Sequence, residues 1–427
     1  MKTQPKEMYI LSLIEMCQRF AFWGIGNLLV LYVVSIYKFS DQEATHLYGI
    51  FTGIAFILPL FGGYIADQTS YQKSVIVGSL STAFGCLLLS TGVLPLLYTG
   101  LFFAATGASI FTPSIYTLLS RLYQNYPKLR EGGFSIYYSA VNVGVFLATF
   151  ILGALGHKGY WREAFILAAL IQLLGLLIFL KVMKLPHFLK MHSNASSLLE
   201  KEDTSSLTKV QKGRIAVICI LSFISILFWM CYVQGWSSMT LFTLRYTDKM
   251  IGNFEVPTSW FLSLETLYLI LLAFPLAFCY KLLAKYQKDP SPSLKTALSL
   301  IAMGLCFFVM RQGALQIPSG SLSDSISPSY LITAFAFMAL AEMLIAPIGL
   351  SLVTRLSPPR YTAQLVGIWY LCLGIASYLG GIMAGWMSSM KELSSFFEIF
   401  IYLSWIPAII LLLMAKRLTK LSHMEDL

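Results

Sequence analysis

The stretches PSIYTLLSRL at residues 113–122 and PIGLSLVTRL at residues 347–356 decide the fold of this chain. Each places a Pro inside a long apolar run and ends on Arg-Leu, with the Arg eight positions after the Pro in both. Pro59 and Pro275 lie in two further apolar runs that occupy matching places in the two halves of the chain. A Pro removes a helix hydrogen bond and permits a bend, so Pro113 and Pro347 are candidate gating residues. The repeat predicts two parallel halves.

The composition identifies the class of protein. Of the 427 residues, 57% are hydrophobic and 12% are charged, and the mean hydropathy is +0.72. In soluble domains about 45–50% of the residues are hydrophobic and about 25% are charged. The composition of this chain therefore excludes a disordered chain, a fibrous repeat and a soluble multidomain enzyme. A helix needs about 20 apolar residues to cross roughly 30 Å of hydrocarbon. We therefore predict an all-α membrane protein with twelve spans, at residues 8–36, 46–66, 73–92, 97–121, 133–156, 161–183, 214–244, 256–283, 293–311, 328–354, 361–388 and 394–415.

The longest polar break divides these spans six and six. It separates an N-terminal six-helix bundle at residues 1–184 from a C-terminal bundle at 214–427, with a cytoplasmic linker at 185–213. Most of the 30 Lys and Arg residues lie on one side when both termini and the linker are placed in the cytoplasm. The first apolar run continues to about Ile36, too long for the h-region of a signal peptide, so we expect it to remain as a span. The expected location is a bacterial inner membrane.

Ionisable residues within the spans are few, and each is a candidate functional residue because charge in hydrocarbon is costly. Glu15 and Arg19 stand one turn apart on one helix face. They form either a self-neutralising ion pair or a charged site that faces a central cavity. Glu265 and Glu342 have no basic neighbour one turn away. They are either protonated packing residues or cavity residues that bind a cation or a proton.

Other polar positions give weaker signals. Asp67 closes the second span at the cytoplasmic edge and is a candidate gating residue. Every His is predicted to lie in a loop or at a span end. The seven Cys fall in apolar runs without metal-ligand spacing, so we expect no metal and no cofactor. Trp23 and Trp369 are candidate substrate-binding residues, although Trp in a span is also a common core residue or interface anchor.

Several runs resemble one known family. EMCQRFAFWG at residues 15–24 resembles the E-x-x-E-R-F-x-Y-Y-G motif of proton-dependent oligopeptide transporters. FSIYYSAVNVGVFLA at 134–148 closely resembles their fifth-span signature, and LPLFGGYIAD at 58–67 is similar to their second-span ending. With further similarities in spans seven, eight, ten and eleven, the resemblance covers nearly the whole chain. It implies the major facilitator fold and the import of di- and tripeptides with protons.

The resemblance also implies residue roles. Glu15 and Arg19 match the first-span residues that couple protons and bind the peptide carboxylate. Asn142 matches the Asn that binds the peptide backbone or amino terminus, and Glu342 matches the Glu that pairs with the amino group. The candidate substrate-binding residues are therefore Arg19, Trp23, Asn142, Glu265, Glu342 and Trp369.

The departures from the family pattern affect its charges. The second Glu of the first-span motif is Gln18, the span-seven Glu is Val233, and the span-four Lys is Thr112. The span-eight Asn is Glu265, which gives the amine-binding side a second acid. We therefore expect a substrate with more positive charge, or less carboxylate, than an ordinary dipeptide. Gln18 and Val233 cannot titrate, so Glu15 and Glu265 are predicted to share proton coupling.

The leading prediction is a monomeric symporter that imports small peptides with protons by alternating access. One alternative is a weakly coupled facilitator or exporter of amine-like or other small cationic solutes, which the missing charges favour. A transporter-like receptor and an intramembrane enzyme are weaker alternatives. The linker has little room for a signalling domain, and the spans lack a catalytic arrangement. The expected partners are the substrate, protons and the lipid bilayer, without nucleic acid.

Overall fold

The computed structural model describes residues 4–126, 129–183, 208–286, 290–319, 324–358 and 361–422. Twelve helices within these ranges are long and apolar enough to cross a membrane, which confirms the predicted number of spans. Most of the predicted linker, at residues 184–207, lies outside the described residues. The second helix begins at Asp41, five residues earlier than predicted. His46, predicted to lie at the start of this span, therefore lies inside the helix, because the helix begins with a polar first turn that contains Asp41 and Glu43.

Two compact units make up the chain. Unit 1 comprises Met1–Lys38 and Ile54–Lys201, and unit 2 comprises Phe39–Gly53 and Glu202–Leu427. The boundary runs through the second helix, whose first half packs with unit 2 and whose second half packs with unit 1. The predicted bundle limits of 1–184 and 214–427 remain a prediction.

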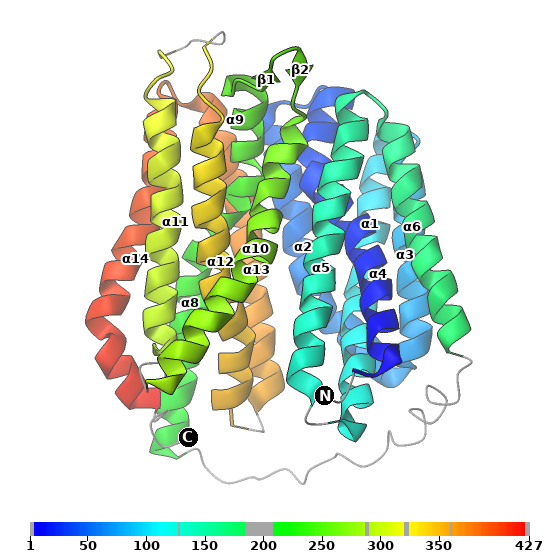
Figure 1. Cartoon of the computed structure of the whole chain (residues 1–427), viewed down its shortest axis with the longest axis vertical. Helices are drawn as coiled ribbons and strands as arrows, with labels where there is room; N and C mark the ends of the chain where they lie inside the picture. The colour runs from blue at the N-terminus through cyan, green and yellow to red at the C-terminus, as the bar shows by residue number, and fades with distance from the viewer. Residues whose placement is uncertain are drawn as a thin grey trace. The chain divides into compact units, whose positions relative to one another are not determined.

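The helices of unit 1 pack around the first span (Figure 1). Helix α1 contacts α4, α5 and α6, and α3 packs closely along α4. Between them these helices carry the first-span and fifth-span motifs. The elements are α1 (Lys6–Ile36), α2 (Asp41–Gln68), α3 (Tyr71–Leu89), α4 (Leu94–Leu122), the 3-10 helix η1 (Tyr123–Asn125), α5 (Arg130–His157) and α6 (Trp161–Val182).

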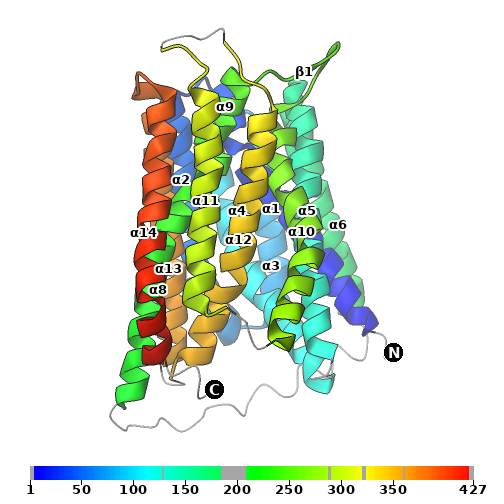
Figure 2. The same cartoon turned by 60° about the vertical axis from the view of Figure 1, so that its left-hand side comes forward.

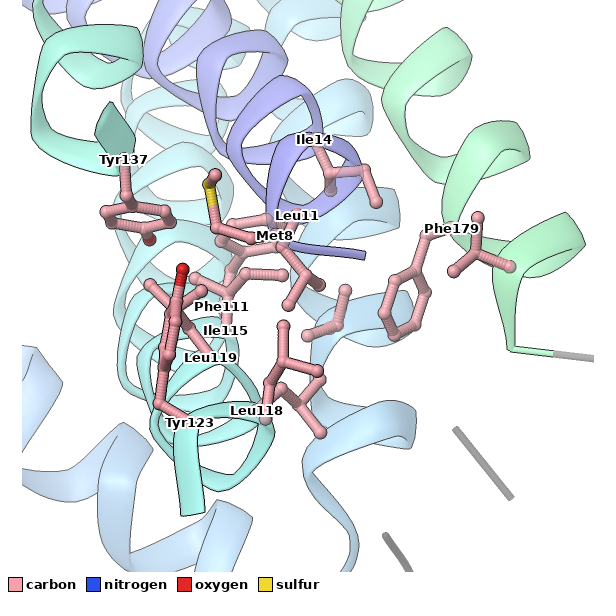
Figure 3. Close-up of a cluster of buried hydrophobic side chains, with 13 residues drawn as sticks. Met8, Leu11, Ile14, Phe111, Ile115, Leu118, Leu119, Tyr123, Tyr137 and Phe179 are labelled. Carbon is pink, nitrogen blue, oxygen red and sulfur yellow. The ribbon is translucent and has the colours of Figure 1, made fainter. Parts of the chain in front are cut away.

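An apolar cluster fixes α1 against its neighbours at the end of unit 1 where α1 begins. Figure 3 shows side chains of α1 and α4 meeting there, with one aromatic ring from α5 and one from α6. Close packing of these apolar side chains holds the first turns of α1 in place. These turns lie one and two turns before Glu15. The labelled residues are Met8, Leu11, Ile14, Phe111, Ile115, Leu118, Leu119, Tyr123, Tyr137 and Phe179.

In unit 2, α11 lies between α14 and α12, as Figures 1 and 2 both show. Helix α12 also contacts α10, α13 and α8. Helices α10 and α12 carry the two acids predicted to face the substrate. The elements are α8 (Lys209–Tyr232), the 3-10 helix η3 (Val233–Trp236), α9 (Ser238–Tyr246), β1 (Met250–Ile251), β2 (Phe254–Glu255), α10 (Thr258–Lys285), α11 (Pro292–Ala314), α12 (Ser329–Leu356), α13 (Thr362–Gly385), the 3-10 helix η5 (Trp386–Ser389) and α14 (Leu393–Ser422).

The seventh span is broken, which the sequence did not predict. Helix α8 ends at Tyr232, a 3-10 turn follows, and α9 continues the span from Ser238. The amide of Gln234 donates hydrogen bonds to the carbonyls of Met230 (3.1 Å) and Gly380 (2.9 Å), and Ser238 donates to Gln234 (2.6 Å). The first bond gives a partner to a backbone carbonyl of α8 next to the break, and the second joins the break to α13.

The first half of α2 joins unit 2 through close backbone contact and one ion pair. A Cβ added at Gly49 would lie 2.9 Å from the Cα of Gly381 on α13, so glycine is required for this approach. The guanidinium of Arg245, in the last turn of α9, binds both carboxylate oxygens of Asp41. This fork attaches the start of α2 to the end of the seventh span.

Candidate functional site

The charged pair of α1 forms as predicted. Nε of Arg19 donates to Oε1 of Glu15 at 2.6 Å. The Glu15 side chain is fully buried, whereas that of Arg19 is 17% exposed. Glu15 is the only hydrogen-bond partner of Arg19 among the described residues. Because the bond uses Nε, the two terminal nitrogens stay available as a fork that matches a carboxylate.

Polar groups surround the buried side of this pair. The second oxygen of Glu15 has no hydrogen-bond partner within the described ranges. The hydroxyl of Tyr137, on α5, lies beside Glu15 but completes no well-formed hydrogen bond there. Its ring meets that of Tyr116, on α4, edge-on at 5.2 Å. The pair thus leaves one buried carboxylate oxygen without a partner among the described residues.

Gln18, which replaces an acid of the family motif, has a structural contact. Its amide nitrogen donates to Oγ1 of Thr82 on α3 at 3.2 Å, and Thr82 donates in turn to the carbonyl of Gly78. The chain thus replaces a titratable group with a neutral link between α1 and α3.

The other candidate residues of unit 1 lie on α1 and α5. Trp23 is half-buried and meets the rings of Phe22 (5.3 Å) and Phe56 (6.2 Å). Asn142 is 9% exposed, and its amide nitrogen donates to the carbonyl of Tyr138 one turn earlier (3.1 Å). This bond leaves the amide oxygen of Asn142 to accept from a ligand. Their roles in substrate binding remain predictions.

The two acids of unit 2 are brought together. The hydroxyl of Tyr232, at the end of α8, lies 2.8 Å from Oε2 of Glu342 and 3.2 Å from Oε1 of Glu265. Thr266 donates to the second oxygen of Glu265 at 3.1 Å. Glu265 is 1% exposed and Glu342 is half-buried, and neither has a cationic partner in the part of the chain described here. We call Glu265 and Glu342 the acid pair, and Tyr232 its bridging tyrosine.

Two further positions of unit 2 lie near the break in the seventh span or on α13. Val233 is buried and packs against Gly380, where an added Cβ would lie 3.1 Å from the Val233 side chain. A packed aliphatic side chain therefore occupies the position where the family motif has an acid. Trp369, on α13, is 7% exposed, and no hydrogen bond or ring contact joins it to another described residue. Its role also remains a prediction.

The predicted gating residues lie on three helices, α2, α4 and α12. Pro113 lies inside α4, and Gly62 on α2 comes so close to α4 that an added Cβ would be 2.1 Å from the carbonyl oxygen of Ser109. Asp67 lies in α2 and Pro347 in α12, but their side chains are outside the described part of the chain. The guanidinium of Arg121 lies over the ring of Tyr71 at 4.6 Å.

Sequence reasoning missed both tyrosines and the ion pair of α2. Tyr232 and Tyr137 each lie in a run that was singled out for its family resemblance, but neither was recognised as a partner of an acid. An aromatic hydroxyl within an apolar span could have signalled this, since it requires a hydrogen-bond partner there. The pairing of Asp41 with Arg245 joins residues 204 positions apart, and no local pattern signals it.

Comparisons with known proteins place the chain among transporters. A family model described as the POT family matches residues 72–198 and 181–400. The chain is 26% identical over 449 residues to the peptide transporter YePEPT of Yersinia enterocolitica, with 89% of this chain and 88% of that protein covered. It is 24% identical to the dipeptide and tripeptide permease A of Proteus mirabilis, with 99% and 96% covered.

Solved structures agree in fold. The crystal structure of peptide transporter POT in complex with sulfate matches with a TM-score of 0.86 at 22% identity, covering 98% of this chain and 96% of that one. A POT family transporter in complex with a thioalcohol-conjugated peptide matches with a TM-score of 0.85 at 19% identity, with 97% of each chain covered. The predicted fold, a major facilitator architecture of twelve helices, is confirmed.

Proposed function

Because the chain belongs to the POT family, we propose that it is an integral membrane transporter that imports small peptides together with protons by alternating access. The observation that carries the proposal is the opposite charge that two clusters, one in each unit, offer to a ligand. Unit 1 presents the partly exposed guanidinium of Arg19, and unit 2 presents two carboxyls without a cation. A free peptide has a carboxylate for the first and an ammonium group for the second.

Proton coupling is assigned to Glu15 and Glu265. When a peptide carboxylate engages Arg19, the Coulomb attraction between Arg19 and Glu15 is shared, and the buried carboxyl of Glu15 then takes up a proton. The ligand and the proton thus favour each other's binding, which is the differential interaction that coupled transport requires. Glu265 contributes through the acid pair. Asn142, Trp23 and Trp369 are proposed to contact the peptide, and Asp67, Pro113 and Pro347 to act in gating.

The proposal includes location and assembly. The relatives named above are bacterial, so we place this chain in a bacterial inner membrane. We place both termini and the linker at 185–213 in the cytoplasm. The linker follows the N-terminal bundle at 1–184 in the sequence and precedes the C-terminal bundle at 214–427. We propose a monomer. One structural relative is described as tetrameric, which makes the oligomeric state a direct test.

A weakly coupled facilitator or exporter of amine-like solutes is the second candidate. It is favoured by the contacts of Gln18 and Val233, because a neutral amide and a packed aliphatic side chain occupy two places where the family resemblance expects acids.

Uptake into proteoliposomes with an imposed pH gradient separates the two candidates. Dialanine, a lysine-containing dipeptide and an amine without a carboxylate are the substrates, and liposomes without protein are the control. Accumulation of the dipeptides that disappears when the gradient is dissipated is expected. Uptake without any pH dependence, or of the amine alone, would replace the symporter with the facilitator.

A further inference from the structure

The acid pair contains more hydrogen-bond contacts than two ionised carboxylates can make. Glu265 and Glu342 both lie within hydrogen-bond distance of one hydroxyl oxygen, and two carboxylates held so close together repel each other unless one of them carries a proton. Tyr232 has a single hydroxyl hydrogen, yet its oxygen lies within hydrogen-bond distance of both acids. The second contact is satisfied when a protonated carboxyl donates to the tyrosine oxygen. The geometry is therefore that of two carboxyls and one shared proton, with a net charge of minus one.

Other groups do not change this balance. The groups that face the pair are Tyr232 of α8, Thr266 of α10 and the two acids themselves. No Lys, Arg or His forms an ion pair with either acid within the described ranges. The described residues thus offer no cation that compensates the remaining negative charge, and an uncompensated charge in a buried place is costly.

An unused donor lies next to the pair. The indole ring of Trp229, one turn before Tyr232, meets the tyrosine ring edge-on at 5.2 Å. Its buried N–H has no hydrogen-bond partner among the residues described. Buried donors are normally satisfied, and an indole N–H requires an acceptor, such as a carbonyl oxygen of a peptide ligand. This observation is independent of the acids, and it is consistent with a ligand that places a carbonyl beside its ammonium group.

Resting on the proposed function, we propose that the acid pair accepts two positive charges, and that a second cationic group of a substrate can replace the shared proton. A peptide with one ammonium group neutralises the single negative charge, and the proton stays with the pair. A peptide with a second ammonium group on the same residue supplies both charges. The carboxyl O–H bond then breaks, the proton leaves to water, and two carboxylates face two ammonium groups. The substrate class singled out is peptides with an amino-terminal lysine.

Lysyl-alanine and norleucyl-alanine form a matched pair of probes, because they differ by the side-chain ammonium group at similar length. Binding to the purified full chain is measured by calorimetry in two buffers of different ionisation enthalpy, at about pH 5.5 to 6.5, where α-amino groups (pKa about 7.7–8.0) stay protonated. Both peptides have the same carboxylate, so any proton taken up at Glu15 cancels in the difference.

Binding of lysyl-alanine is expected to release about one proton more than binding of norleucyl-alanine. The ratio of its affinity to that of norleucyl-alanine should therefore rise about tenfold for each unit by which the pH is raised. In Glu265→Gln the difference should vanish, whereas Glu163→Gln, which removes an exposed acid in the first turn of α6, should keep it. Equal proton release by the two peptides in the wild-type chain would overturn the inference, even if Glu265→Gln failed to fold. If neither peptide binds, the proposed function itself fails.

Discussion

The two charged clusters differ in how each keeps a buried carboxyl stable. In unit 1, Glu15 is fully buried beside Arg19, and the chain itself supplies the compensating cation. In unit 2, Glu265 is equally buried beside a second acid, and among the described residues its hydrogen-bond partners are the hydroxyl groups of Tyr232 and Thr266. A buried carboxylate needs a paired charge or a proton. The first cluster is therefore complete without a ligand cation, whereas the second depends on a proton or on the substrate.

This difference indicates what each cluster asks of a ligand. We propose that the first, which has a spare guanidinium fork, takes an anion that competes with Glu15 for Arg19. We propose that the second, which has spare negative charge, takes a cation that competes with or joins a proton.

Removing the built-in cation should have the largest effect. Arg19→Ala leaves the buried carboxyl of Glu15 without its partner, which we expect to lower the free energy of unfolding by about 3–5 kcal/mol and to abolish dialanine uptake. The double variant Glu15→Gln/Arg19→Ala should recover most of the stability but none of the uptake. Thermal unfolding in detergent and proteoliposome uptake measure the two effects. A double variant as unstable as the single one would show that charge pairing is not the cause.

Removing one acid of the pair should have a narrower effect. Glu265→Gln can keep hydrogen bonds to Tyr232 and Thr266 but cannot hold the shared proton. We expect pH-driven accumulation of dialanine to be lost while counterflow exchange under equal pH continues. Exchange needs substrate binding and alternating access but no proton gradient. The same pair of assays on Glu163→Gln is the control, and pH-driven accumulation by Glu265→Gln would refute the assignment.

The sequence predicted much of the first cluster and only part of the second. Glu15 and Arg19 lie one turn apart, so the period of the helix is enough to bring them together. Glu265 and Glu342 are 77 positions apart on α10 and α12, and their meeting through Tyr232 depends on where α8 breaks. The twelve spans follow from apolar length alone. The break itself follows from bonds such as that of Gln234 to Gly380, which tertiary packing decides.

The packing of α2 on α4 gives a test of the scaffold beneath the first cluster. Gly62→Ala would place a Cβ 2.1 Å from a backbone oxygen of Ser109, whereas the nearest atom to a Cβ at Gly63 is Cβ of Pro113 at 3.8 Å. We expect Gly62→Ala to destabilise the chain by about 1–3 kcal/mol, because backbone must move. Gly63→Ala should change stability by about 0.5 kcal/mol or less. Thermal unfolding of both variants measures the difference, and equal stability would mean that the helices separate freely there.

The smallest effect should come from the tyrosines, and it compares the two clusters directly. Tyr232→Phe removes the hydroxyl that contacts both acids, whereas Tyr137→Phe removes one that lies beside Glu15 without a well-formed hydrogen bond. A net hydrogen bond contributes about 1 kcal/mol, so Tyr232→Phe should change the affinity for dialanine about fivefold. Tyr137→Phe should change it by less than about twofold, since no bond of good geometry is lost. Binding calorimetry on both variants decides between them. If Tyr137→Phe has the larger effect, a ligand-bound state must form the bond that Glu15 lacks, and the first cluster would then reorganise more than the second when substrate arrives.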